Sequence, residues 1–124
     1  MQKISKEDIR QKLLEHTSTH PESITLNKED YNLLLENKSI YIIEKILYIS
    51  NSININFEDC DIQNAKTALV NFTLCEDYTF SIISEIMDKL YNSMDEDADV
   101  MLCTTPIKEY PKDQINLAIY LGFD

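Results

Sequence analysis

Two groups of side chains in the sequence have residue types that could bind a metal ion. The first is the acidic run Asp95-Glu96-Asp97-Ala98-Asp99, which is similar to the start of an EF-hand calcium loop. That loop needs glycine and glutamate at positions where this chain has Val100 and Pro106. The second is His16 and His20, four residues apart, with no third ligand at a zinc-site spacing. We therefore predict no metal site, but a solvated acidic turn and surface histidines.

The cysteines and the single glycine argue against catalysis and nucleotide binding. Cys60, Cys75 and Cys103 are odd in number and contain no Cys-x-x-Cys pair, which is typical of reduced thiols. Cys75 and Cys103 lie near predicted strand ends, so we expect small buried groups rather than nucleophiles. Gly122 is the one glycine, which excludes the glycine-rich loops that hold phosphates. We expect no enzyme activity, no cofactor and no nucleotide bound by this chain alone.

The charge balance limits the partners. Lys plus Arg is 11 and Asp plus Glu is 22 in 124 residues, so the net charge is −11. This charge disfavours nucleic acid and anionic membrane surfaces, both of which attract basic proteins. The sequence shows neither a secretory signal nor an apolar stretch long enough to span a membrane. We expect a cytoplasmic protein of one domain, with a helix over 1–20 and the core over 21–124.

The first half of the chain predicts two helices. Ser5 is a candidate N-cap for a helix over 6–17, and Pro21 closes this unit. A second helix begins near Asp30 and is expected to bury Leu33, Leu34 and Leu35.

The segment 39–50 combines β-branched residues with isoleucines at helical spacing. We predict a strand over 39–43 followed by a short helix, and then a loop over 51–64.

The second half predicts strand, helix, strand and strand. Residues 67–73 alternate as a strand does, and a helix capped by Asp77 or Thr79 extends to about Asn92. The apolar face of this helix is expected to contain Phe80, Ile83, Met87, Leu90 and Met94. A strand over 100–104, a turn between Pro106 and Pro111 and a strand over 114–121 with one apolar face complete the pattern.

These elements indicate the α+β class. The strand-helix-strand unit allows a right-handed crossover between parallel strands, and the last connection is short enough for a hairpin. We predict a mixed sheet of three to four strands packed against two or three helices.

From about residue 9 onward the sequence resembles the C-terminal domain of the tubulin-like cell-division protein FtsZ. The resemblance depends on the segments Ala65-Lys66, Leu69-Val70-Asn71-Phe72-Thr73, Asp95 to Asp99 and Gly122-Phe123-Asp124, and on their order. Upstream, His20 to Asp30 is similar to the family's loop after its long central helix. The resemblance implies the FtsZ C-terminal fold without the nucleotide-binding domain. The family's two glycines after the Asn-x-Thr strand are Leu74 and Cys75 here, so we expect this turn to differ.

The resemblance also implies a partner-contacting loop over 24–30. In the family, the pattern Asn-x-Asp-x-x-Asp enters the nucleotide pocket of the next subunit in a head-to-tail filament. Thr25 replaces the asparagine, Asn27 replaces the first aspartate and Asp30 is kept. Asn27 can neither act as a base nor supply full negative charge. The hypothetical partner-binding residues are Thr25, Leu26, Asn27, Glu29 and Asp30. In the alternative interpretation, Asp30 only caps the following helix.

Three functions are compatible with these observations. The first is a non-catalytic FtsZ-like protein-interaction domain that docks on FtsZ and caps or regulates filaments in cell division. The second is a structural domain that associates with a second copy of itself. The third is a small-molecule-binding α+β domain, for which no site can be assembled from the sequence.

Overall fold

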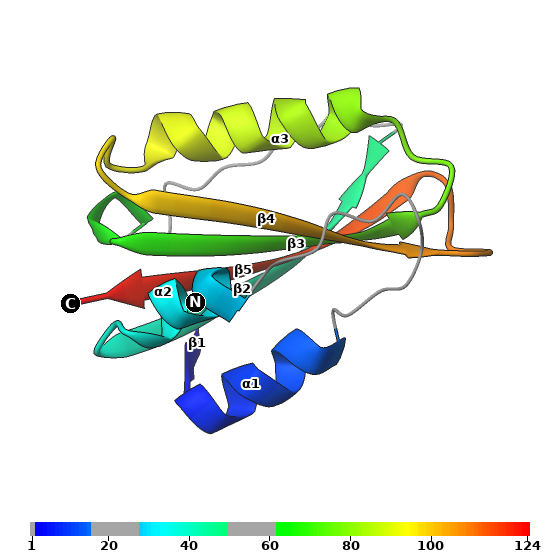
Figure 1. Ribbon diagram of the computed structural model, residues 1–124. Coiled ribbons are helices and arrows are strands. Elements are labelled where there is room, and N and C mark those ends of the chain that lie inside the picture. The colour runs from blue at the N-terminus through cyan, green and yellow to red at the C-terminus, as the bar shows by residue number, and fades with distance from the viewer. Residues whose placement is uncertain (1, 16–27, 50–61) are drawn as a thin grey trace.

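A five-stranded mixed sheet lies between two layers of helices (Figure 1). The computed structural model describes residues 2–15, 28–49 and 62–124. The strand order is β1-β2-β5-β3-β4, in which only β3 and β4 are parallel. Helix α3 covers one face, and α1 and α2 lie on the other. The elements are β1 (Gln2–Ile4), α1 (Lys6–Glu15), α2 (Lys28–Leu35), β2 (Ser39–Tyr48), the short 3-10 helix η2 (Ile62–Asn64), β3 (Thr67–Cys75), α3 (Phe80–Ser93), β4 (Asp99–Ile107) and β5 (Gln114–Phe123).

The α+β class with a mixed sheet is confirmed, but the number of strands was underestimated. The short strand β1 pairs antiparallel with β2 and places Lys3 opposite Tyr41. Its three residues carry too short a pattern to show alternation in the sequence. It therefore adds a fifth strand at one edge.

Strand β2 is continuous from Ser39 to Tyr48, so the short helix predicted after residue 43 was wrong. Ten consecutive residues of β2 pair with β5, from Ser39 opposite Phe123 to Tyr48 opposite Gln114. The isoleucines at helical spacing belong to this ladder, where β-branched side chains pack well. Pairing with β5 therefore makes the whole of residues 39–48 a strand, although their local pattern was compatible with either a strand or a helix. Most of the loop predicted over 51–64 lies outside the described residues, and its last three residues form η2.

Strand β5 lies at the centre of the sheet, between β2 and β3. The connection after β4 therefore passes the end of β3, and the predicted hairpin between the last two strands was wrong. The predicted parallel crossover from β3 through α3 to β4 is confirmed. Because β5 is covered by helices on both sides, it buries Leu117 and Leu121 on one face and Ala118 and Tyr120 on the other. The expectation of one apolar face was also wrong.

The caps and faces of the helices agree in part with the sequence patterns. The backbone N–H of Asp8 donates to Oγ of Ser5 at 3.2 Å, which confirms the N-cap of α1. Thr79 occupies the N-cap position of α3, but its side chain makes no capping hydrogen bond. On α3, Phe80 is exposed rather than buried, and Ile86 takes its place in the core.

Two apolar cores lie on the two faces of the sheet. The larger packs α3 against alternate residues of β3 and β5, including Phe72, Ile83 and Leu117. The smaller packs α1 and α2 against the other face through Ile9, Leu34 and neighbouring strand residues. Of the three leucines expected to be buried in α2, Leu34 is fully buried and Leu33 is exposed.

Candidate protein-interaction surface

The described part of the predicted partner loop is the first turn of α2. Thr25, Leu26 and Asn27 lie outside the described residues, so the structure neither places them nor brings them together with the rest. Glu29 is exposed and Asp30 is half-buried, and both complement the positive end of the helix dipole. Asp30 lies inside the first turn of α2 and not at the N-cap position before the helix. Its charge therefore stabilises α2 by interacting with the helix dipole. Docking through these five residues stays a prediction.

The other end of α2 is fixed by Asn37, which the sequence analysis missed. Its side-chain N–H groups donate to the carbonyl oxygens of Leu33 at 3.1 Å and Leu34 at 2.9 Å. The same nitrogen lies 3.1 Å from Oγ1 of Thr67 in β3. Asn37 is buried, and its three hydrogen bonds join the end of α2 to the sheet. They therefore set the position of the acidic first turn relative to the strands.

Gly122 makes room for this arrangement. A Cβ atom built on Gly122 would collide with Cγ and Nδ2 of Asn37. The φ angle of Gly122 is not positive, so glycine is required here for space and not for backbone conformation. Gly122 belongs to the segment on which the FtsZ resemblance depends, and the structure gives the physical reason for its presence.

Beside α2, a buried polar network crosses β3 and β4. The Sγ–H of Cys103 donates to Oδ1 of Asn71 at 3.2 Å, and the hydroxyl of Thr105 donates to the same oxygen at 3.0 Å. The side-chain amide of Asn71 donates to Oγ1 of Thr73 at 3.1 Å. Asn71 is fully buried, so these bonds satisfy an amide that would otherwise be costly to bury.

Burial in this network lowers the reactivity of the Cys103 thiol. Burial raises the pKa of Cys103 to about 12. The pKa of Tyr31 in α2 is also raised, first by burial and then by the nearby Cys103 and Asp30. A thiol with a raised pKa carries very little thiolate at neutral pH, so Cys103 is a poor nucleophile. The expectation that Cys75 and Cys103 are buried is confirmed, and neither forms a disulfide.

The acidic run before β4 forms a turn. The backbone N–H of Asp97 donates to Oδ1 of Asp95 at 2.9 Å, while Glu96, Asp97 and Asp99 are exposed. Among residues 2–15, 28–49 and 62–124, no three side chains of His, Cys, Asp or Glu come together in a metal-binding arrangement. His16 and His20 lie outside these ranges.

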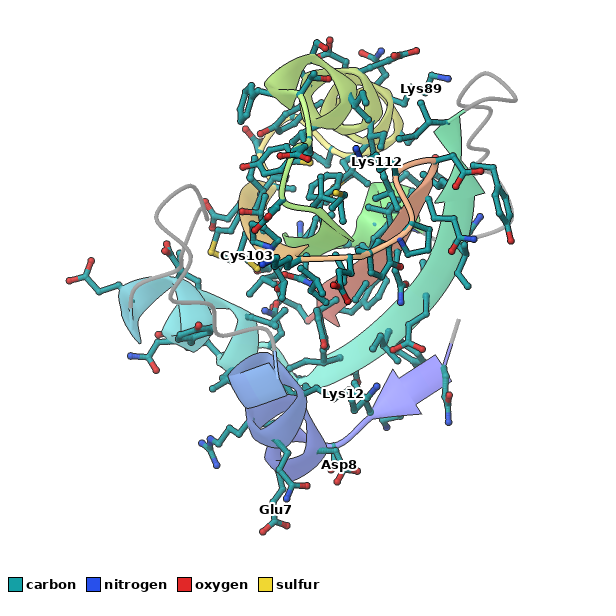
Figure 2. The ribbon with its side chains drawn as sticks, turned by 90° about the vertical axis from the view of Figure 1, so that its right-hand side faces the viewer. Glu7, Asp8, Lys12, Lys89, Cys103 and Lys112 are labelled. Atoms are coloured by element: carbon teal, nitrogen blue, oxygen red, sulfur yellow. The ribbon has the colours of Figure 1, made fainter. Side chains whose placement is uncertain are left out.

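In the part of the chain that the structure describes, two cavities are candidates for holding a small ligand. The first, of 230 Å³, lies between the end of β3 and the start of α3, is lined mainly by apolar side chains, and includes Lys112 and Asp77, whose charged atoms are 4.0 Å apart. The second, of 320 Å³, is a polar groove between β1, α1 and β2. Lys12 points from α1 toward β2 there (Figure 2), and its Nζ lies 3.0 Å from Oε1 of Glu44. Small-molecule sites usually measure about 300–1,000 Å³ and are mainly apolar, so neither cavity has both properties.

None of the helices in the described part of the chain is long and apolar enough to cross a membrane.

Comparisons with known proteins agree with the fold. The family model described as "FtsZ family, C-terminal domain" matches residues 47–123. No curated protein matches the chain. The solved structure of an empty FtsZ dimer from M. jannaschii is similar with a TM-score of 0.64 and 17% identity, over 80% of this chain and 31% of that one. A tryptophan-to-tyrosine mutant of FtsZ from M. jannaschii gives a TM-score of 0.63 and 18% identity, over 80% of this chain and 32% of that one. The chain thus spans about a third of the length of these FtsZ chains. Because the family model covers more than half of the sequence, this chain belongs to the FtsZ family, and the part of the family that it matches is the C-terminal domain.

Proposed function

We propose that this chain is a non-catalytic interaction domain that docks on FtsZ through its 24–30 loop and caps or regulates filaments during cell division. The observation that supports the proposal is the match of residues 47–123 to the FtsZ C-terminal domain. The acidic residues Glu29 and Asp30 stand in the first turn of α2, next to the segment that resembles the family's partner loop. The role requires the chain to share the cytoplasm with FtsZ.

The mechanism is occupation of one end of a growing filament. Head-to-tail interfaces are heterologous, so each subunit needs two different faces to continue the chain. A domain that presents the loop-bearing face alone would fill the exposed nucleotide face of FtsZ and offer no face to the next subunit. Asn27, in place of an aspartate, would add neither a base nor a full charge to the pocket it enters. We therefore expect docking without stimulation of GTP hydrolysis.

The test is polymerisation of the host's FtsZ with GTP, followed by light scattering and sedimentation. Capping predicts a lower scattering plateau at substoichiometric amounts of this protein, because each bound copy stops one filament end. GTP hydrolysis should fall in parallel with the amount of polymer.

Matched variants test the loop. The double variant Asn27→Ala/Asp30→Ala should lose most of the effect, whereas Glu7→Ala/Gln11→Ala, which removes the same two kinds of group from exposed positions on α1, should keep it. Unchanged polymer at a several-fold excess of this protein would remove the proposal. A loop variant as effective as the unmodified protein would show that docking occurs elsewhere.

A further inference from the structure

The outer edge of β4 is a long strand edge that the described residues leave without a neighbouring strand. Strand β4 pairs with β3 on one side, and β1 and β4 are the two edges of the sheet. Edge strands expose unpaired N–H and C=O groups and accept further strands unless they are short or charged. β1 has three residues and carries Lys3, whereas β4 has nine residues and no charge after Asp99. The edge at β4 is therefore better suited than the edge at β1 to pair with an additional strand.

The register shows which groups of β4 point outward. The N–H of Asp99 donates to the carbonyl oxygen of Lys66 at 3.0 Å, so the backbone of Asp99 faces β3. Backbone direction alternates along a strand, so Met101 and Cys103 also face β3, and Val100 and Leu102 face outward. Pro106 is an outward residue as well. Proline is accepted there because an outward position needs no ladder hydrogen bond.

The charge around this edge indicates the kind of strand that it would accept. Glu96, Asp97 and Asp99 are exposed at the start of β4, and the whole chain has a net charge of −11. A second copy of the chain carries the same net charge of −11, and the repulsion between two such chains disfavours self-pairing. A strand with basic residues at one end complements it. In antiparallel pairing, the more stable arrangement per residue, these basic residues lie at the C-terminal end of the added strand.

We propose that the outer edge of β4 binds an extended segment of a partner protein, with alternating apolar residues and a basic C-terminal end, as an added sixth strand. Main-chain hydrogen bonds to Val100 and Leu102 provide affinity, and the acidic turn sets the direction of the segment. The residues of β4 are not among those proposed for filament capping, so the inference does not depend on that proposal.

The experiment uses a labelled synthetic peptide, acetyl-Thr-Val-Thr-Ile-Thr-Val-Lys-Arg-Lys-amide, titrated with the full chain and followed by fluorescence anisotropy. Two control peptides replace the basic end by Glu-Asp-Glu or the isoleucine by proline. The first peptide should bind, and both controls should bind about tenfold more weakly, through charge repulsion or loss of main-chain pairing.

Variants of the protein locate the site. Leu102→Pro removes an outward N–H while leaving the bonds between β3 and β4 in place, and should weaken binding about tenfold. Glu96→Gln/Asp97→Asn should weaken it about fivefold at low salt. Glu7→Gln/Asp8→Asn makes the same charge change on the outer side of α1, far from α3 and Lys89 (Figure 2), and should leave binding unchanged. Should Leu102→Pro fail to fold, the amide NMR signals of Val100 and Leu102 in the unmodified chain report the contact directly.

Three results would overturn the inference. One is equal binding of the basic and acidic peptides. Another is peptide-induced shifts confined to residues outside β4. The third is a concentration-dependent dimer that Leu102→Pro dissociates, which would assign this edge to a second copy instead.

Discussion

Replacing Gly122 with alanine should destabilise the protein, because the added methyl group would occupy the space that the Asn37 side chain fills. The new Cβ would lie 3.0 Å from Cβ of Asn37 and would overlap its amide group. Asn37 would have to leave its position and give up its hydrogen bonds to Leu33, Leu34 and Thr67. The two hydrogens of this amide contribute about 1 kcal/mol each, and leaving a buried acceptor unpaired adds about 1 kcal/mol more, so the free energy of unfolding falls by about 3 kcal/mol.

Part of this loss is offset by the backbone. Alanine in a strand interior is favoured over glycine by roughly 0.5–1 kcal/mol, so the expected net loss is about 2 kcal/mol. At an unfolding entropy of about 2.1 cal/mol/K per residue, this corresponds to a fall in Tm of roughly 8 °C for a chain of this length. The measurement is urea and thermal unfolding followed by circular dichroism.

A double-mutant cycle distinguishes this cause from a general intolerance of β5 to substitution. Asn37→Ala alone should cost about 3 kcal/mol, since the same hydrogen bonds are lost. In that background the space above Gly122 is open, so Gly122→Ala should no longer destabilise, and the two sites should be coupled by about 3 kcal/mol. Asn92→Ala, at an exposed position of α3, is the control and should change stability little. If Gly122→Ala costs the same with and without Asn37, the steric reasoning is refuted.

Three other predictions follow from the buried network and from the turn before β5. Because the pKa of Cys103 is raised from 9.0 to about 12, the unfolded chain ionises this thiol first, and stability should fall between pH 9 and 12. The fall should approach about 1.4 kcal/mol per pH unit in urea titrations, and a Cys103→Ala variant should show a shallower decline. Asn71→Ala should lower the free energy of unfolding by about 3 kcal/mol, since hydrogen bonds are lost and a buried cavity is created; a loss below about 1 kcal/mol would contradict the role given to this network. Glu109 has a φ of 69°, in the left-handed region, so Glu109→Gly should raise stability by about 0.5 kcal/mol, whereas Lys108→Gly should not.

The sequence predicted the elements whose pattern is local and long. The alternation in Thr67–Cys75 and the apolar face of α3 are properties of single segments, and both elements formed as expected. The predicted N-cap at Ser5 also depends on a few neighbouring residues, and its hydrogen bond is present. The collinear matches to FtsZ supplied the family, which periodicity alone does not provide.

The errors arose where distant segments determine the structure. The ten-residue ladder with β5 makes residues 44–48 extended, although their own pattern also allows a helix. The short loop after β4 allowed a hairpin between β4 and β5. Instead, β5 lies between β2 and β3, where both of its faces are buried. The roles of Asn37 and Gly122 depend on a contact across 85 positions of the chain, for which the sequence carries no signal.

The candidate site was predictable only in part. The sequence identified the acidic start of α2, and the structure places Glu29 and Asp30 in its first turn. The polar network around Asn71 was missed, because Asn71, Cys103 and Thr105 come from two strands that meet only in the folded sheet. The open edge of β4 could be recognised only from the observed strand order, because the expected hairpin would have paired β4 with β5 and left β4 inside the sheet.

The central place of β5 has a consequence for the order of folding. Strands β2 and β3 are not paired with each other, and in the sheet they are joined through this last strand. A nascent chain that has not yet emerged beyond β4 can form the β3–α3–β4 unit but has no partner for most of β2. The complete sheet can form only when β5 meets β2, a segment far from it in the sequence. Bringing such distant segments together is entropically costly and slows folding. We expect a concerted transition in which both apolar cores appear together once β5 inserts.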